Sequence, residues 1–154
     1  MHMHTRDKGF TLIELLIVVA IIGIIAAIAI PNLLNAIHRG KQKRSQADIR
    51  SIGTAVESYQ VDNGVPPNSP TAPDVRAALS GQLSPTFIKI IPAADGWGGA
   101  FDWAKGADEY TISSLGKDRA KEASPPLDRT TSFARDIIYS NGVFTQWPDG
   151  TQGN

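Results

Sequence analysis

The apolar positions of this chain are concentrated in one stretch near its start. Between residues 10 and 30, 18 of 21 residues are apolar, and the exceptions are Thr11, Glu14 and Gly23. A helix of this length is roughly 31 Å long, close to the thickness of the hydrocarbon core of a bilayer. A core helix of a soluble protein keeps a polar stripe, and this stretch has none. The pattern therefore predicts a hydrophobic transmembrane helix over residues 10–30.

A cleaved secretory signal is the alternative interpretation of such a stretch. The apolar part of a signal peptide is shorter, and a cleavage site of the small-x-small type follows it. Here the long apolar run gives way to Pro31 and a further helical pattern. We therefore expect the apolar segment to stay in the mature protein.

After Pro31 the helical pattern becomes amphipathic. Apolar side chains recur at steps of three or four residues, on one helix face, at Ile49, Ile52, Val56 and Tyr59. Asn63-Gly64 is a C-terminal stop signal. Because proline lacks an N–H and crowds the preceding turn, Pro31 predicts a kink within one long helix rather than a break. Residues 31–64 are thus expected to continue the membrane helix as an amphipathic segment.

Residues 65–154 are expected to form a small globular domain with loops and strands. A loop-rich connection over residues 65–92, with a short helix near residues 74–79, leads to segments of period two. Residues 109–114 and 136–146 are predicted strands, and Asn141-Gly142 is a strong hairpin signal within the second. Helix first and strands later predicts an α+β fold, in which a small antiparallel sheet packs on the long helix.

The amino-acid composition argues against several classes of function. The chain has 15 basic and 15 acidic residues and no cysteine, so no nucleic-acid partner is indicated, and disulfides and cysteine catalysis are excluded. The histidines are His2, His4 and His38, which leaves no histidine base for a serine of the C-terminal domain. The GWGG segment at 96–99 precedes no helical pattern, so we interpret it as a turn with Trp97 packed on the sheet. We expect a protein that is not an enzyme.

The start of the chain carries a distinctive combination of residues. A short basic segment ends in Gly9, Phe10 follows it, Glu14 comes early in the apolar run and Pro31 closes that run. This combination, in KGFTLIELLIVVAIIGIIAAIAIPN, resembles the class III signal of type IV pilins and of the pseudopilins of type II secretion. Further along, IPAADGWGGAFDW, YTISSLGKD and DIIYSNGVF resemble the sheet and loop of the major pseudopilin, in the same order.

The resemblance implies a pilin-like fold and a structural role. A prepilin peptidase is expected to remove residues 1–9 by cutting between Gly9 and Phe10, and to methylate the new amine of Phe10. The subunit is expected to lie in the lipid of the bacterial inner membrane, with its N-terminus cytoplasmic and its C-terminal domain periplasmic. An assembly platform with an ATPase then builds a homo-oligomeric helical filament, which is periplasmic or extracellular.

Three roles remain open at this stage. A major pseudopilin of type II secretion and a subunit of a type IV pilus are both filament subunits. The DGWG and SSLGKD segments, and the absence of a cysteine pair, favour the pseudopilin. The alternative from another class is a single-pass membrane protein that displays a binding domain and does not polymerise.

Glu14 is the one carboxylate within the apolar stretch. A charge inside a membrane span costs several kcal/mol unless it is paired, and such residues are usually functional. In a filament, the amine of a neighbour's Phe10 is its expected partner, and the pair would fix the axial register. The alternative is a carboxylate at a helix start, where the helix dipole favours negative charge. With Gly9, Phe10 and Pro31 in place, the resemblance favours the register role for Glu14. We assign both Glu14 and Pro31 to assembly of the filament.

The basic residues beside the apolar stretch give a conflicting signal. Arg6 and Lys8 precede the span, and four basic residues follow it: Arg39, Lys41, Lys43 and Arg44. Positive charge is usually retained on the cytoplasmic side, so this count would place the C-terminal domain in the cytoplasm. The resemblance implies the opposite, and we follow it. The four residues contact lipid headgroups or form a solvated face.

Calcium is the candidate ligand, because the resemblance implies a calcium site in the loop between the last strands. Calcium prefers hard oxygen ligands, and the candidates here are the Leu115 carbonyl and the carboxylates of Asp118, Asp128 and Asp136. The loop departs from the family pattern, since Arg119 stands where glycine is usual. It also contains cations that oppose calcium, namely Lys117, Lys121, Arg129 and Arg135. The alternative is a polar surface loop held by salt bridges.

Overall fold

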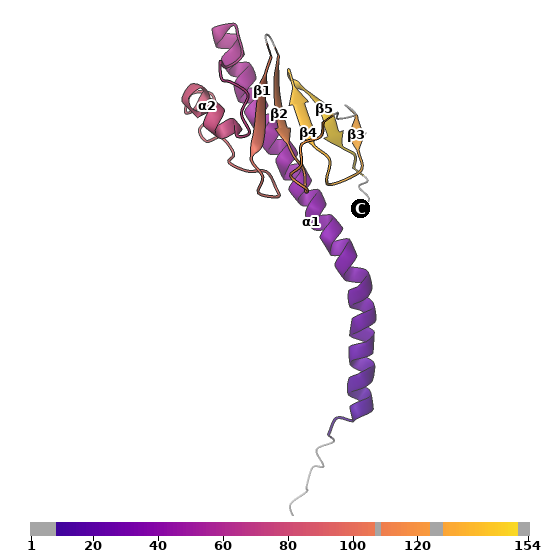
Figure 1. Ribbon diagram of the computed structural model, residues 1–154. Helices are drawn as coiled ribbons and strands as arrows, with labels where there is room; N and C mark the ends of the chain where they lie inside the picture. Colours follow the sequence, from indigo (N-terminus) through magenta and orange to yellow (C-terminus); the bar gives the residue numbers. More distant parts are fainter. Residues whose placement is uncertain (1–8, 107–108, 124–127, 151–154) are drawn as a thin grey trace, which may run out of the picture. The chain divides into compact units, whose positions relative to one another are not determined.

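The structure, a computed structural model, describes residues 9–106, 109–123 and 128–150 (Figure 1). It comprises two compact units, residues 1–34 and 35–154. Helix α1, Leu12–Asn63, contributes to both of them. The helix ends where Asn63-Gly64 predicted: Gly64 has a φ of 79°, a conformation natural to glycine, and its N–H donates to the Gln60 carbonyl at 2.8 Å.

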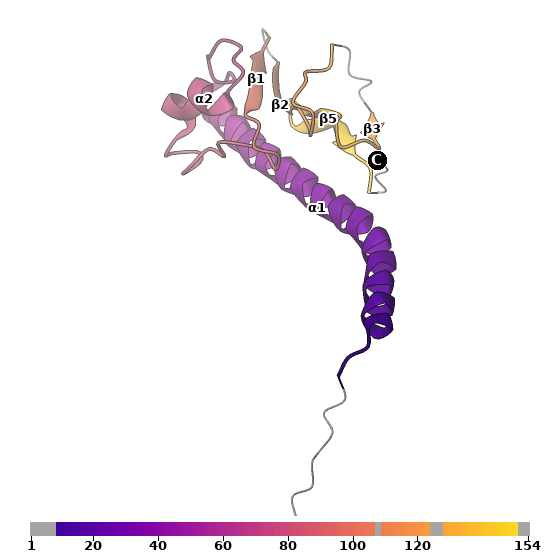
Figure 2. The same cartoon turned by 60° about the horizontal axis from the view of Figure 1, so that its bottom comes forward.

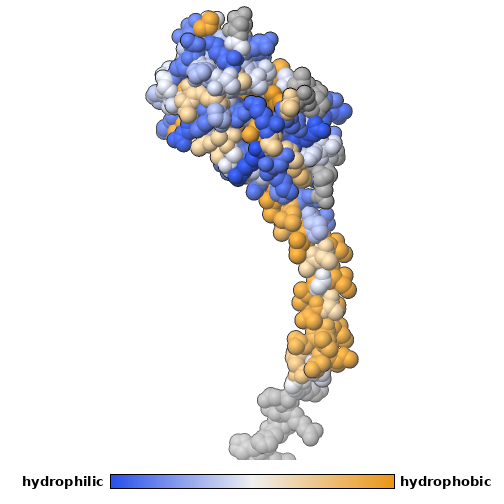
Figure 3. Space-filling view, in the orientation of Figure 1, coloured by the Kyte–Doolittle hydropathy of each residue, from blue (hydrophilic) through white to orange (hydrophobic). Residues whose placement is uncertain are grey.

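The first unit exposes its apolar side chains on all sides of the helix. Residues 12–25 are all exposed, and the space-filling view colours this part of α1 almost entirely as hydrophobic (Figure 3). The helix is long and apolar enough to cross a membrane, and no residue of its most apolar 18-residue stretch is buried. A core helix of a soluble protein would be mostly covered, so these side chains require lipid or other helices.

The second unit contains the rest of α1, a short helix and a five-stranded sheet (Figures 1 and 2). Helix α2 spans Val75–Leu83, and the Asp74 carboxylate accepts from the N–H groups of Arg76 and Ala77 as its N-cap. The strands are β1 (Phe101–Lys105), β2 (Tyr110–Ser114), β3 (Arg129–Thr130), β4 (Ile137–Ser140) and β5 (Val143–Pro148). Their order across the sheet is β1-β2-β4-β5-β3. This confirms the predicted α+β, pilin-like fold.

The sheet is mixed rather than wholly antiparallel. Strands β1, β2, β4 and β5 pair antiparallel, whereas β3 pairs parallel to β5. The reason is the long connection after β2, which carries residues 129–130 to the outer edge of β5 before the chain returns as β4. At the other edge Ala72 forms an isolated bridge with Trp103, with N–H to carbonyl distances of 2.8 and 2.9 Å.

The β4–β5 hairpin turns at Asn141-Gly142, as predicted. Both residues have positive φ values, 45° and 90°, which a two-residue turn of this twist requires. The Asn141 side chain also accepts from the N–H of Tyr110 at 3.0 Å. The turn is therefore tied to the neighbouring strand β2.

The core lies between the second part of α1, α2 and one face of the sheet. The predicted helix face is confirmed, since Ile49, Ile52 and Val56 are fully buried and Tyr59 packs against them. The sheet contributes its largest buried side chains to the same cluster: Phe101, Trp103, Tyr110, Ile112 and Tyr139. Burial of these apolar surfaces fixes the second part of α1 against the sheet.

One acidic side chain of α1 reaches the tyrosines of the sheet. Glu57 Oε1 accepts from the hydroxyls of Tyr110 at 3.0 Å and Tyr139 at 2.7 Å. Gly53, one turn earlier, lies against Tyr139, and a Cβ there would lie 2.3 Å from the ring. Helix and strand β4 therefore approach closely at this point because the helix has no side chain there.

The GWGG segment is a turn, as predicted, but Trp97 does not pack as predicted. Asp95 Oδ1 accepts from the N–H groups of Trp97 at 2.9 Å and Gly99 at 2.8 Å. Trp97 lies outside the buried core of the sheet, and its indole N–H donates to Nδ1 of His38 on α1 at 3.3 Å. The indole is directed to the helix because its N–H needs an acceptor, which His38 provides.

Candidate functional site

The predicted cleavage site lies just before the helix. Gly9 and Phe10 precede α1 in non-helical, exposed backbone, and 84% of the Phe10 surface is accessible. An atom at the Cβ position of Gly9 would meet nothing within 4 Å. Peptide bonds are cut most readily in exposed backbone outside regular structure. The geometry is thus compatible with a cut between Gly9 and Phe10, which stays a prediction.

The carboxylate of Glu14 is hydrogen-bonded within its own helix turn. Its Oε2 accepts from the backbone N–H of Thr11 at 2.9 Å and from the Thr11 hydroxyl at 2.6 Å. In return, the Glu14 N–H donates to the Thr11 hydroxyl oxygen at 3.3 Å. This reciprocal pattern is a capping box, which satisfies the free N–H groups at a helix start.

Thr11 is a helix-capping residue that the pattern of apolar positions does not reveal. The signal for it was nevertheless in the sequence, as Thr-x-x-Glu at the start of an apolar run. The capping box agrees with the view of Glu14 as a carboxylate at a helix start. The register role concerns contacts between subunits and stays a prediction. Removal of residues 1–9 would leave Thr11 and Glu14 in place, with the new amine on Phe10 next to the capping box.

Helix α1 continues through Pro31, so the predicted absence of a break is confirmed. Proline has no N–H to donate into the preceding turn. The side chain of the next residue, Asn32, donates to the Ile28 carbonyl at 3.1 Å and so supplies an additional donor to that turn. The kink at Pro31 stays a prediction.

The residues predicted to bind calcium are spread along the connection from β2 to β4. Leu115 is half-buried, and Asp118 and Asp128 are exposed, with their Oδ1 atoms accepting from the N–H groups of Ala120 and Arg129. Asp136 is only 2% exposed, and its Oδ2 accepts from the Glu122 N–H at 3.1 Å. Within the described part of the chain, no three or more acidic, histidine or cysteine side chains form a group that could hold a metal.

Protein cations lie where the candidate calcium site was expected. Lys121 pairs with Asp102 at 2.9 Å, and Arg135 pairs with Glu122 at 3.4 Å. Arg119 donates to the Trp97 carbonyl and has a φ of 58°, the left-handed conformation that glycine adopts most easily. These contacts match the predicted alternative of a loop held by salt bridges. Calcium stays a prediction, supported by the buried Asp136 Oδ1, which has no hydrogen-bond partner among the described residues.

Burial raises the pKa of the Asp136 carboxyl to about 6. The Glu122 N–H opposes this shift, whereas the negative charges of Glu122, Asp118 and Asp102 add to it. The unfolded chain has the ordinary pKa of 3.8. Because the pKa of Asp136 is higher in the folded chain than in the unfolded chain, protonated Asp136 favours the folded state. This contribution to the free energy of unfolding is fully present below pH 3.8 and is lost as the pH rises through about 6.

Asp136→Asn should therefore flatten the pH dependence of stability. In calcium-free buffer, the free energy of unfolding of the parent chain is expected to fall as the pH rises from about 4 to 7, by about 1.4 kcal/mol per unit of pKa difference at most. Urea unfolding of the full chain in detergent micelles, at several pH values, measures this. Equal slopes in both proteins would contradict the assigned burial.

Calcium gives the same variant a second readout. If calcium binds the Asp136 carboxylate, adding calcium at pH 7 raises the unfolding midpoint of the parent chain and not that of Asp136→Asn. Identical midpoints of the parent chain in calcium and in chelator would remove calcium from the description of this loop.

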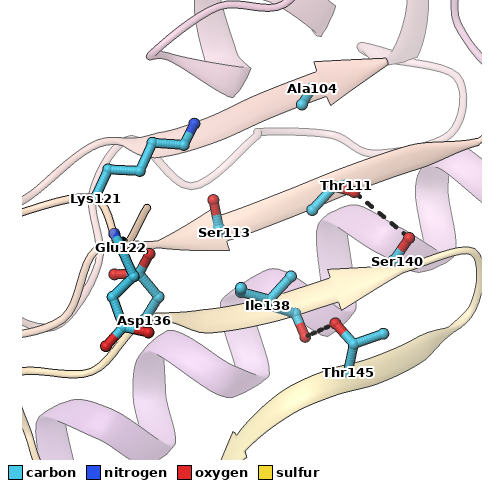
Figure 4. A pocket seen from close by; sticks show the side chains of 9 residues that line it. All are labelled: Ala104, Thr111, Ser113, Lys121, Glu122, Asp136, Ile138, Ser140 and Thr145. Carbon is cyan, nitrogen blue, oxygen red and sulfur yellow. Dashed lines mark hydrogen bonds between the residues drawn. The ribbon is translucent and has the colours of Figure 1, made fainter. Parts of the chain in front are cut away.

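The outer face of the sheet, opposite α1, has a hollow of about 370 Å³ (Figure 4). Small and hydroxyl-bearing side chains form most of its lining, and charged ones lie at one end: Ala104, Thr111, Ser113, Ile138, Ser140, Thr145, Lys121, Glu122 and Asp136. The described histidine, His38, lies elsewhere and is hydrogen-bonded to Trp97. A hydroxyl group needs a base to become a nucleophile. The described residues of this hollow thus offer no Ser-His arrangement.

Comparison with known families accounts for most of the chain. Residues 4–30 match the prokaryotic N-terminal methylation motif. Residues 32–128, more than half of the chain, match the type II secretion system protein G family. The chain belongs to this protein G family. Its members are structural pseudopilins, so the prediction of a non-enzymatic protein agrees with the family.

Individual relatives include both pseudopilins and pilins. The type II secretion system core protein G of Vibrio cholerae is 33% identical over 125 residues, which are 73% of this chain and 82% of the relative. The corresponding protein of Escherichia coli is 28% identical over 125 residues, with coverage of 73% and 83%. The type IV major pilin protein PilA of Myxococcus xanthus is 54% identical, but over only 54 residues, 35% of this chain and 24% of PilA.

Proposed function

We propose that this protein G family member is the structural subunit of a filament in a type II secretion system. The observation that carries the proposal is the apolar first unit, whose side chains are exposed on all sides of α1. Such a surface is stable only in lipid or among other helices. The chain also carries the methylation motif at this end. A single helix that leaves lipid and joins identical helices accounts for both features.

We place residues 10–30 in the inner membrane before assembly, with the C-terminal domain on the periplasmic side. An assembly platform, an ATPase and a prepilin peptidase are the partners that this proposal requires. The support for the periplasmic side is the family to which the chain belongs, since the basic residues after the span favour the opposite orientation. The periplasmic domain would form the outer surface of the filament.

Processing is the most direct chemical prediction of this proposal. Mass spectrometry of the protein purified from cells should show a chain that begins at Phe10 with one additional methyl group. Gly9→Leu should block the cut, because a large side chain next to the peptide bond would obstruct the approach of the peptidase, which the open space beside Gly9 now leaves free. Assembled material that retains residues 1–9 would contradict the proposed processing.

A type IV pilus subunit is the second candidate, and the PilA match favours it over a limited part of the chain. A non-polymerising membrane anchor is the third. Electron microscopy of cells that overproduce the chain separates the last from the first two, because only a subunit forms filaments. Filaments that disappear with the secretion ATPase, and not with a pilus assembly ATPase, would support the secretion role.

A further inference from the structure

A second, smaller hollow lies at the first turn of the second unit. It has a volume of about 200 Å³ and takes its walls from α1 and from two parts of the connection between β2 and β4. We call it the His38 pocket. Its lining residues are Asn35, His38, Lys117, Ser132, Phe133 and Ala134, and none of these is acidic. The polar groups of this set consist of an ammonium, an imidazole, an amide and a hydroxyl.

His38 is fixed with a hydrogen-bond donor available. Its Nδ1 accepts from the Trp97 indole N–H at 3.3 Å, and its ring packs against Phe133 with centroids 5.3 Å apart. Burial, together with the positive charges of Lys117 and Lys41, lowers the pKa of His38. The imidazole is therefore neutral at pH 7, and with Nδ1 acting as an acceptor its proton is on Nε2.

The connection between β2 and β4 brings the other donors to the imidazole. The Lys117 N–H donates to the Phe133 carbonyl at 2.9 Å, which holds the two parts of the connection together. Gly116 makes this approach possible, since a Cβ there would lie 2.7 Å from the Ala134 carbonyl oxygen. The Ser132 hydroxyl oxygen accepts from the Ala134 N–H at 3.3 Å, which leaves its own proton to donate.

The donor set fits an anion with several acceptor oxygens. A cation beside neutral donors is the usual recognition of phosphate, and a charge-assisted hydrogen bond is roughly twice as strong as a neutral one. Lys117 supplies the charge, while His38, Ser132 and the Asn35 amide supply directed donors. We propose that the His38 pocket binds a phosphate group, supplied by the headgroup of an anionic phospholipid.

The place of the pocket in the chain indicates the source of the phosphate. Asn35 follows Ile30, the last residue of the predicted span, by only five positions in the sequence. The headgroup layer on each side of a bilayer is roughly 5–8 Å thick. Five residues reach at most about 18 Å even when fully extended, so a span that ends near Ile30 keeps Asn35 close to the headgroups. The lipid as source rests on the proposed membrane insertion, whereas phosphate binding by the pocket does not.

The proposal gives the basic residues after the span a function. Lys41 lies close enough to His38 to lower its pKa, and Lys43 is exposed one turn further along α1 from Arg39. Basic residues near a surface of anionic lipids are attracted to it. Their number beyond the span, which conflicts with the usual charge rule, would then reflect binding of lipid on the far side of the membrane.

The test uses the full chain, labelled with ¹⁵N, in maltoside micelles that contain no phosphate. NMR follows the Trp97 indole N–H and the His38 imidazole during two titrations, one with phosphatidylglycerol and one with inorganic phosphate. Both signals are expected to move in the lipid titration. Lys117→Gln should weaken binding about tenfold, the expected loss for one charge-assisted hydrogen bond.

Matched variants keep the result interpretable. Lys89→Gln makes the same change of charge at an exposed lysine that does not line the pocket, and it should bind like the parent chain. Ser132→Ala should weaken binding less than Lys117→Gln. The proposal is wrong if Lys117→Gln and Lys89→Gln bind phosphatidylglycerol equally well. It is also wrong if neither phosphatidylglycerol nor inorganic phosphate moves the Trp97 and His38 signals.

The two titrations also separate the sources of phosphate. If the Trp97 and His38 signals move during the titration with phosphatidylglycerol, the lipid headgroup is supported as the source of the phosphate, whether or not they also move with inorganic phosphate. If these signals move with inorganic phosphate and not with phosphatidylglycerol, the lipid is not the source of the phosphate. Because micelles need no correct insertion in a cell, a failure of the proposed filament role would leave the result of this experiment unchanged.

Discussion

Glu14→Ala is expected to insert into the membrane and to be processed normally, yet to form no detectable filaments. The span remains apolar without the carboxylate, so insertion is not impaired. In the assembled filament, however, the amine of a neighbouring Phe10 would be buried among helices without its partner. Breaking a buried pair in this way costs about 3–5 kcal/mol. Counting filaments by electron microscopy, beside immunoblots of processed subunit, measures the effect.

The capping box makes a sharper control available. Glutamine can also accept from the Thr11 N–H in a capping box, so Glu14→Gln keeps the helix start and removes only the charge. Thr11→Ala does the reverse, because it removes the hydroxyl that bonds to Glu14 and leaves the carboxylate. We expect few filaments from Glu14→Gln and near-normal numbers from Thr11→Ala. The opposite result would show that Glu14 acts in helix capping rather than in pairing between subunits.

Gly96→Ala is expected to destabilise the C-terminal domain by about 1–3 kcal/mol or more, the usual cost of overpacking. The Gly96 N–H donates to the Ser45 hydroxyl at 2.9 Å, and a Cβ on Gly96 would lie 2.3 Å from the Lys41 carbonyl oxygen. That oxygen belongs to the helix backbone and cannot move aside as a side chain would. The turn that carries Trp97 would therefore have to leave α1. Urea unfolding of the full chain in micelles measures the loss.

Gly81→Ala is the matched control for this variant. Gly81 lies within α2, and a Cβ there would meet nothing within 4 Å. Alanine in a helix is favoured over glycine by about 0.5–1 kcal/mol, so this variant should be slightly more stable than the parent chain. If Gly96→Ala were as stable as Gly81→Ala, the close approach of the turn to α1 would be wrong.

The long helix and its two surfaces could be predicted from the sequence because both depend on local periodicity. The face formed by Ile49, Ile52 and Val56, the stop at Asn63 and the hairpin at Asn141-Gly142 each follow from residues close together in the chain. The parallel pairing of β3 could not be predicted this way, since a two-residue strand has no pattern of its own. The pairing of so short a strand depends on where the rest of the fold places it.

The site residues divide in the same manner. Thr11 and Glu14 form a local contact that a known motif describes. The contact of Trp97 with His38 joins residues 59 positions apart. The sequence predicted Trp97 packed on the sheet instead, because no local pattern indicated His38 as its partner. The salt bridges of Lys121 and Arg135 likewise required the fold, because their partners lie on β1 and elsewhere in the loop.

The outward sides of strands β1 and β5 are each partly covered by a short piece of chain. Ala72 bonds to the free side of β1, and residues 129–130 bond to the free side of β5. A sheet with open sides can pair with the sheet of another molecule and aggregate. In a filament that packs many such domains side by side, the high local concentration would favour pairing between sheets. Partial cover of the sheet edges would reduce such pairing and favour joining of the subunits through their helices.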